Sequence, residues 1–180
     1  MHPFSIGCLM NKFGLKRRTP SEAVYNYFNK EECFKVQKPL RNTELLKNVA
    51  LTLYWCEGTG DRKDAKRNTT LAFTNTDKAM LKIWIKFLLE ICGLDQKKIR
   101  VRLYLHKNQI GDSLKKYWSK ELSVPLGQFE NVSYTKKDST QEHYKGTVKI
   151  KVHNSKLYIL VKTWIEDLKN KIAGIYKVMI

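Results

Sequence analysis

The apolar positions of this 180-residue chain follow two different periods from residue 43 onward. Spacings of three and four residues predict amphipathic helices, whereas strict alternation of apolar and polar residues predicts strands with one buried face. Helices are expected at residues 44–57, between Asp77 and Gly93, at 112–124 and at 155–172. Strands are expected at residues 69–76, 99–106, 132–135 and 145–154. This order predicts an α/β (α+β) protein, with helices packed on the apolar face of a sheet.

Residues 1–42 are expected to form a helical segment separate from the main domain at 43–180. Thr19 followed by Pro20 is typical of a helix start, and the apolar run before it breaks at Gly14. Two short helices around a glycine resemble part of a helix-turn-helix, with three basic residues beside the second helix. A docking helix that does not touch nucleic acid and a poorly ordered arm are the alternatives.

The two longer alternating strands carry basic side chains on one face. Their apolar positions are expected to face the core. The outward positions are Arg100, Arg102, Tyr104, His106, Thr147, Lys149, Lys151 and His153. Solvent-facing strand positions commonly carry Lys, Arg and Thr, but neither strand places an acid on this face. A sheet lying against nucleic acid is therefore predicted, because Arg and Lys bind phosphates and Arg also pairs with guanine edges.

The net charge of +17, from 34 Lys and Arg against 17 Asp and Glu, favours a polyanionic partner, with nucleic acid ahead of an acidic membrane surface. A basic loop after the first helix would add Arg62, Lys63, Lys66 and Arg67. The chain shows neither a signal-peptide pattern nor an apolar run of about 18 residues. The four cysteines lack CxxC spacing and are expected to be free thiols in an intracellular reducing compartment, either cytoplasm or organelle matrix. No membrane partner and no small-molecule cofactor are expected.

The helix at 44–57 ends on an acid. Glu57 is its last residue, and Gly58 follows as a helix stop. The C-terminus of a helix carries partial negative charge, so a carboxylate there is disfavoured by roughly 0.3–1 kcal/mol. A cation held beside Glu57 would remove this penalty; an exposed acid at a frayed helix end is the alternative.

The segment ALTLYWCEG at 50–58 resembles the LAGLIDADG motif of homing endonucleases. The resemblance extends from about residue 44 to the last helix and includes LYWCEGTG, LAFTNTD, IRVRLYLH and GTVKIKV. It implies a curved, mixed and largely antiparallel sheet with helices on one face and basic side chains on the concave face. The sequence departs from the motif at Thr52, where glycine is usual, and at Trp55, which replaces the first acid.

The resemblance also implies site residues. Glu57 matches the terminal acid that enters the active site, so Glu57 and Gly58 are the implied positions for Mg²⁺ or Mn²⁺. The motif does not fix a catalytic lysine, and Lys149 is preferred to Lys151 on the same strand face. The motif helix would pack against a second subunit through Leu46, Val49, Ala50, Thr52 and Leu53.

One motif per chain implies a homodimer that makes a metal-dependent double-strand break in a long, roughly palindromic DNA target. In this family such cleavage serves intron or intein mobility. Two alternatives remain on the same scaffold without cleavage, namely a DNA-binding transcription regulator and an RNA-binding maturase. A third class is a basic structural or ribosome-associated protein, which would bind without sequence preference and without a response to metal.

Overall fold

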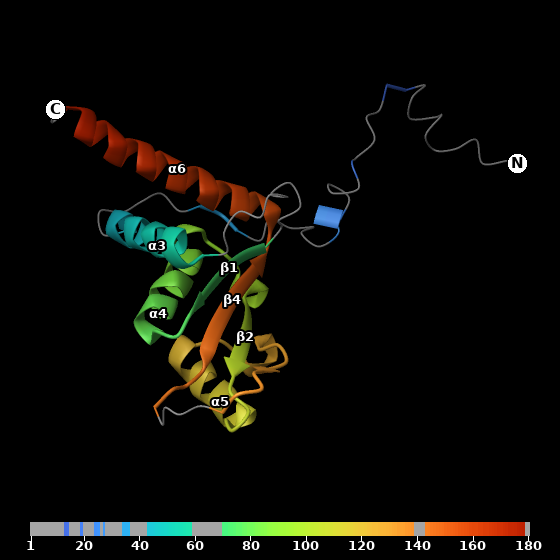
Figure 1. Ribbon diagram of the computed structural model, residues 1–180. Helices are drawn as coiled ribbons and strands as arrows, with labels where there is room; N and C mark the ends of the chain where they lie inside the picture. The colour runs from blue at the N-terminus through green and yellow to red at the C-terminus, as the bar shows by residue number, and fades with distance from the viewer. Residues whose placement is uncertain are drawn as a thin grey trace, which may run out of the picture. The chain divides into compact units, whose positions relative to one another are not determined.

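A computed structural model describes residues 13–14, 19, 24–25, 27, 34–36, 43–58, 70–138 and 143–178 (Figure 1). The regular elements are α3 (Thr43–Glu57), β1 (Thr70–Asn75), α4 (Lys78–Lys86), β2 (Arg100–Leu105), α5 (Gly111–Leu122), β3 (Ser133–Tyr134), β4 (Thr147–His153) and α6 (Ser155–Val178). A π-helical turn, Phe87–Ile91, continues α4, and two short 3-10 turns cover Gln96–Lys98 and Leu126–Gln128. The predicted elements are therefore confirmed, with α6 longer and β3 shorter than expected.

The four strands form one open sheet in the order β1-β4-β2-β3. The β1–β4 and β4–β2 pairs are antiparallel, whereas β3 pairs with β2 in parallel over two residues. The sheet is therefore mixed and largely antiparallel, as predicted. Because β4 lies between β1 and β2, it carries the central row of side chains on each face.

The apolar face of the sheet forms the core together with the helices. Alternate residues of the three longer strands face the core and are buried, and they are Leu71, Phe73, Val101, Leu103, Leu105, Val148, Ile150 and Val152. Ala72 of β1, on the opposite face, is also buried. The helices α3, α4 and α6 all contact β1, and Figure 1 shows α3 lying between α6 and α4. Trp118 and Leu122 bring α5 into the same cluster. Burial of this apolar area is the main stabilising contribution to the fold.

Trp84 lies at the centre of an aromatic cluster that joins α3 to α4. Its ring is fully buried, stacks on Tyr54 of α3 at 4.9 Å between centroids, and packs against Phe87 at 5.2 Å. Asp77 caps the start of α4, because its Oδ1 accepts a hydrogen bond from the Met80 N–H at 2.9 Å. The buried stripe of α4 and of the π-helical turn that continues it consists of Leu81, Trp84, Ile85, Leu88 and Ile91.

One side of α3 packs into the core. Ala50, Leu51 and Tyr54 are the buried residues of this helix, whereas Val49 is 37% exposed. The segment VALTLYWC is apolar around most of its circumference, so spacing alone could not select the side that faces the core. The consequence is that α3 presents a second apolar side to the surface.

The chain divides into two compact units, Met1–Glu32 and Cys33–Ile180, so the larger unit begins ten residues earlier than predicted. Phe34 packs against the core, and the Lys35 N–H donates to the Gly93 carbonyl at 3.3 Å. Gly93 has φ +60°, and a Cβ there would lie 2.0 Å from the Lys35 carbonyl oxygen. Of the first unit, the structure describes a turn at 13–14 and helical backbone at 24, 25 and 27. No helix in the described ranges has the length and apolar character required to cross a membrane.

Candidate nucleic-acid interface

The register of the sheet brings the predicted basic residues onto one face, which we call the polar face. Arg100 lies opposite Lys151, Arg102 opposite Lys149, and Tyr104 opposite Thr147. On the other side of β4, Thr70 pairs with His153 and Thr74 with Lys149. His106 follows the end of β2. The alternation predicted from the sequence is therefore confirmed. The strands β2 and β4 form one surface, although each pair of facing residues is at least 43 positions apart in the sequence.

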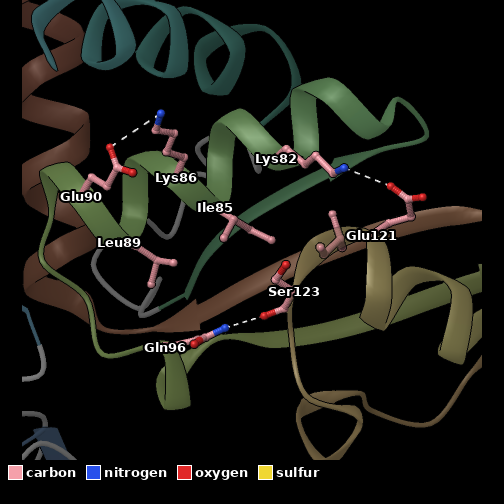
Figure 2. A pocket seen from close by; sticks show the side chains of 9 residues that line it. Lys82, Ile85, Lys86, Leu89, Glu90, Gln96, Glu121 and Ser123 are labelled. Atoms are coloured by element: carbon pink, nitrogen blue, oxygen red, sulfur yellow. Dashed lines mark hydrogen bonds and ion pairs between the residues drawn. The ribbon is translucent and has the colours of Figure 1, made fainter. Parts of the chain in front are cut away.

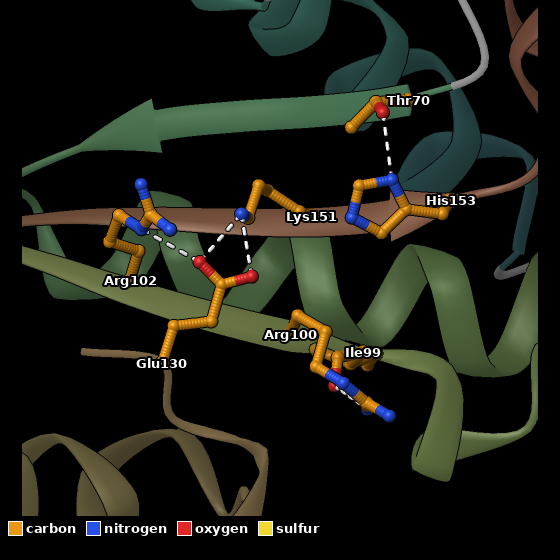
Figure 3. Close-up of polar contacts among 7 residues, drawn as sticks. All are labelled: Thr70, Ile99, Arg100, Arg102, Glu130, Lys151 and His153. Carbon is orange, nitrogen blue, oxygen red and sulfur yellow. Dashed lines mark hydrogen bonds and ion pairs between the residues drawn. The ribbon is translucent and has the colours of Figure 1, made fainter.

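A carboxylate from outside these two strands also lies on this face. Glu130, in the segment after the Leu126–Gln128 turn, accepts from Arg102 Nε at 2.7 Å and from Lys151 Nζ at 2.6 Å (Figure 3). Its backbone N–H donates to the Val101 carbonyl at 2.8 Å, and Phe129 bridges to Val101. The position of the carboxylate beside β2 is therefore fixed by the main chain.

Sequence reasoning missed Glu130 because it belongs to no periodic segment. The one available signal was that Glu130 is the only acid between Glu121 and Asp138. Partial burial raises its pKa, but the hydrogen bond and charge of Lys151, with Arg102, more than offset this and hold the pKa of Glu130 below its usual range. The carboxylate is therefore ionised at neutral pH.

The cations of the polar face are not equivalent. Lys151 is only 13% exposed at its side chain and is paired with Glu130. Arg100 donates from Nη1 to the Lys97 and Ile99 carbonyls at 2.6 and 2.8 Å. Lys149, by contrast, makes no ion pair or hydrogen bond within the described residues. Of the two lysines of β4, Lys151 is paired with a carboxylate, whereas the charge of Lys149 is not compensated by any described residue.

Hydrogen bonds fix the two ends of the polar face. At one end, His106 Nδ1 lies 3.1 Å from both Thr135 Oγ1 and the Lys137 carbonyl, and Tyr144 bonds Thr147 at 2.7 Å. At the other end, His153 Nδ1 lies 2.9 Å from Thr70 Oγ1. Burial, followed by the charge of Lys151, lowers the pKa of His153. His153 therefore contributes hydrogen bonding rather than positive charge at neutral pH.

The end of α3 reaches the free edge of the sheet beside β1. Gly58 forms an antiparallel bridge with Phe73, the residue that pairs with Ile150 of β4. Glu57 is exposed, and the last turn of α3 contains no basic residue. The unfavourable position of the carboxylate at this helix end is therefore not relieved from within the helix.

Gly58 has no room for a side chain. A Cβ there would lie 2.3 Å from the Tyr54 carbonyl oxygen and 2.7 Å from the buried Tyr54 ring. We expect Gly58→Ala to lower the free energy of unfolding by about 1–3 kcal/mol, because the ring or the helix end must move. Urea unfolding would measure this loss. Gly127→Ala, where a Cβ meets no atom within 4 Å, is the matched control and should change stability little. Equal stability of the two variants would contradict this packing argument.

The basic loop and the metal position were also predicted from the sequence. Arg62, Lys63, Lys66 and Arg67 lie outside the described residues. No group of three or more His, Cys, Asp or Glu side chains suited to a metal is formed by the residues described here. Glu57 therefore contributes a single carboxylate, with the backbone at Gly58 beside it. Carboxylate and carbonyl oxygens are the ligand types that Mg²⁺ and Mn²⁺ prefer.

The predicted subunit-contact residues do not lie on one surface of α3. Ala50 is fully buried in the core of the chain itself, and Leu46 and Leu53 are partly buried against it. Val49 and Thr52 lie on the outer side. The physical reason is the all-round apolar character of α3, which made the core side and the outer side indistinguishable in the sequence.

A pocket of about 360 Å³ lies on the helical side of the molecule, between the α4 region and α5 (Figure 2). Charged side chains of both signs line it, and Lys82 pairs with Glu121 at 3.0 Å. The Gln96 side chain closes one end by donating to the Ser123 carbonyl at 2.6 Å. This mixed lining differs from the cationic polar face and offers no comparable surface for a polyanion.

Comparison with protein-family models, curated proteins and solved structures gives no match for this chain.

Proposed function

We propose that this protein is a site-specific, metal-dependent DNA endonuclease of the LAGLIDADG type that acts as a homodimer on a roughly palindromic duplex. One observation carries the proposal. The Gly58–Phe73 bridge holds the acid-bearing end of α3 at the edge of a cationic sheet face. Basic side chains that could bind phosphate and an exposed carboxylate without a basic neighbour in its helix turn are thereby combined on one domain.

The polar face supplies the binding surface in this proposal. A sheet can read nucleic acid through its outward side chains, with cations on phosphates and Arg, Asn or Gln on base edges. Duplex DNA is favoured over duplex RNA because the major groove of B-form DNA admits protein elements, whereas that of A-form RNA is too deep and narrow.

Glu57 is the proposed metal ligand. A divalent cation held by this carboxylate would activate water and stabilise charge that develops on the attacked phosphate. The same cation would relieve the unfavourable position of Glu57 at the helix end. Lys149 is the proposed catalytic lysine, because its ammonium is uncompensated within the described residues whereas that of Lys151 is paired with Glu130. Its charge would offset negative charge on the phosphate.

The proposed dimer contact is the outer side of α3. Leu45, Val49, Thr52 and Cys56 follow one another at spacings of four, three and four residues, and all are exposed. The Thr52 hydroxyl donates to the Asn48 carbonyl at 2.9 Å, so it can enter an apolar contact with its hydrogen bond already made. A twofold pairing of this side would bring two Glu57 carboxylates toward a common centre.

The dimer contact can be tested through Cys56. This thiol is exposed, whereas Cys92 is buried and its burial raises the pKa of the Cys92 thiol to about 12. In a variant whose cysteines outside the described residues, Cys8 and Cys33, are replaced by serine, we expect a short thiol–thiol cross-linker to form a covalent dimer on a denaturing gel. Cys56→Ser should prevent this product while leaving the helical circular-dichroism signal unchanged. Equal cross-linking of the Cys8→Ser, Cys33→Ser variant with and without Cys56→Ser would exclude this side of α3 as the contact.

The activity itself is tested by incubating the full chain with a randomised duplex library and Mg²⁺, and then sequencing the new DNA ends. The proposal predicts ends that share one roughly palindromic sequence. Sequence-specific binding without new ends would favour the transcription-regulator alternative. Binding of structured RNA in preference to duplex DNA would favour the maturase alternative. Binding without sequence preference would instead support a structural or ribosome-associated role.

A further inference from the structure

The polar face contains a carboxylate whose two partners are the cations expected to bind DNA. Glu130 lies between Arg102 and Lys151, and each contact is 2.7 Å or shorter. The Glu130 side chain is 22% exposed. In a chain of net charge +17, an ionised acid in the middle of the proposed DNA-binding surface opposes simple phosphate attraction. It therefore requires a role other than adding to affinity.

The contact orients the guanidinium of Arg102. Glu130 accepts from Nε (Figure 3), and neither Nη atom is in a hydrogen bond or ion pair with the described residues. A guanidinium presents its five N–H groups in a rigid plane, so fixing Nε also fixes the directions of the Nη–H donors. The edge that stays available is the one formed by both Nη atoms, which can donate two parallel hydrogen bonds.

The carboxylate is itself held in place. Lys151 Nζ lies 2.6 Å from Oε1, and the Glu130 N–H bonds the Val101 carbonyl next to Arg102 in the chain. Lys151 is therefore occupied in fixing Glu130 and is poorly placed to bind phosphate. The side chains of Arg102 on β2, Lys151 on β4 and Glu130 therefore hold one another in place. The pair of N–H donors that they leave available is the one on the two Nη atoms of Arg102.

We infer that Arg102 reads a guanine in the major groove and that Glu130 is the positioning residue that gives this contact its selectivity. Guanine presents two adjacent acceptors, N7 and O6, which match a pair of parallel N–H donors. A phosphate also accepts such a pair, but it does not require a fixed direction, since a freely rotating arginine or lysine serves equally well. The inference rests on the proposed DNA binding and adds to it a base and a residue that determines specificity.

The test measures base preference rather than affinity alone. The full-length protein is equilibrated with a randomised duplex pool in Ca²⁺, and bound and free DNA are sequenced. Wild type should prefer guanine at one position in each half-site, by roughly 5- to 150-fold over other bases, as expected of a bidentate contact. Arg102→Ala should abolish the preference at that position only. Glu130→Gln, which keeps one acceptor oxygen, should weaken it, and Glu130→Ala should remove most of it.

The same Glu130 variants should bind non-specific DNA as tightly as wild type or more tightly, because a negative charge has been removed from the surface. Glu121→Gln is the matched control: Glu121 also pairs with two lysines, Lys78 and Lys82, and its side chain is 24% exposed, but it lies on the helical side. Its base preference should equal that of wild type. Thermal unfolding of each variant confirms that it is folded.

Three results would overturn the inference. Guanine preference in Glu130→Ala equal to wild type would exclude positioning by Glu130. A uniform loss of preference at all positions would show a general structural effect instead. A preference at the Arg102-dependent position for a base other than guanine would refute the base assignment. If wild type bound no duplex DNA, the proposed function would fail together with the inference, whereas the first three results leave the proposed function standing.

Discussion

Glu57→Gln should abolish Mg²⁺-dependent DNA cleavage while leaving DNA binding intact. Gln keeps the size of the side chain and a carbonyl oxygen, but it lacks the negative charge that holds a divalent cation. Glu57 is exposed at the end of α3, so the substitution should not disturb the core. Binding should be equal to wild type or slightly tighter, because a negative charge near the phosphates is removed. Cleavage of a selected target duplex and a gel-shift titration in Ca²⁺ measure the two effects separately.

Two controls accompany this prediction. Asp61 and Asp64 follow Glu57 closely in the sequence but match no motif position, so Asp61→Asn and Asp64→Asn should retain cleavage. In wild type, Ca²⁺ should support binding without cutting, because Ca²⁺ coordinates with looser geometry than Mg²⁺. A Glu57→Gln protein that cuts at the wild-type rate would remove Glu57 from the active site and leave the non-cleaving alternatives.

The sequence was most informative where one side of an element is clearly polar. In β2 and β4 the alternation assigned every outward residue correctly, because a strand reverses the direction of its side chains at each step. In α4 and the π-helical turn that continues it, a polar side opposite Trp84 and Leu88 makes the buried stripe equally clear. Such patterns are local, and local patterns can be read without knowing which elements meet.

The sequence was least informative where the outcome depends on contacts between distant segments. Glu130 lies in an irregular segment, and its place beside Arg102 follows from the bridge between Phe129 and Val101, which no periodicity encodes. The parallel pairing of β3 with β2 is likewise a long-range result. In α3, Ala50 was predicted to contact a second subunit, but it is buried in the core of its own chain. Both sides of this helix are apolar, so the sequence does not show which side faces the core.

The unequal surroundings of the two β4 lysines lead to a second large expected effect, on the salt dependence of DNA binding. Affinity for duplex DNA should fall steeply with salt, by roughly 10³-fold or more between about 50 and 200 mM if about six phosphates are neutralised. Lys149→Ala should weaken binding and reduce the slope of log affinity against log salt by about one, because its ammonium is uncompensated within the described residues. Fluorescence anisotropy at several salt concentrations gives the slope.

Lys151→Ala is the matched comparison, since it removes a lysine from the same strand and the same face. The Lys151 ammonium is already paired with Glu130, so it should bind no phosphate and release few counterions from DNA. The slope of log affinity against log salt should therefore stay close to that of wild type. Arg102→Ala should reduce affinity, because a guanidinium on the polar face is lost. Unchanged affinity in both Arg102→Ala and Lys149→Ala would show that the polar face is not the DNA-binding surface. Equal slope reductions in Lys149→Ala and Lys151→Ala would instead show that Glu130 releases Lys151 to phosphate when DNA binds.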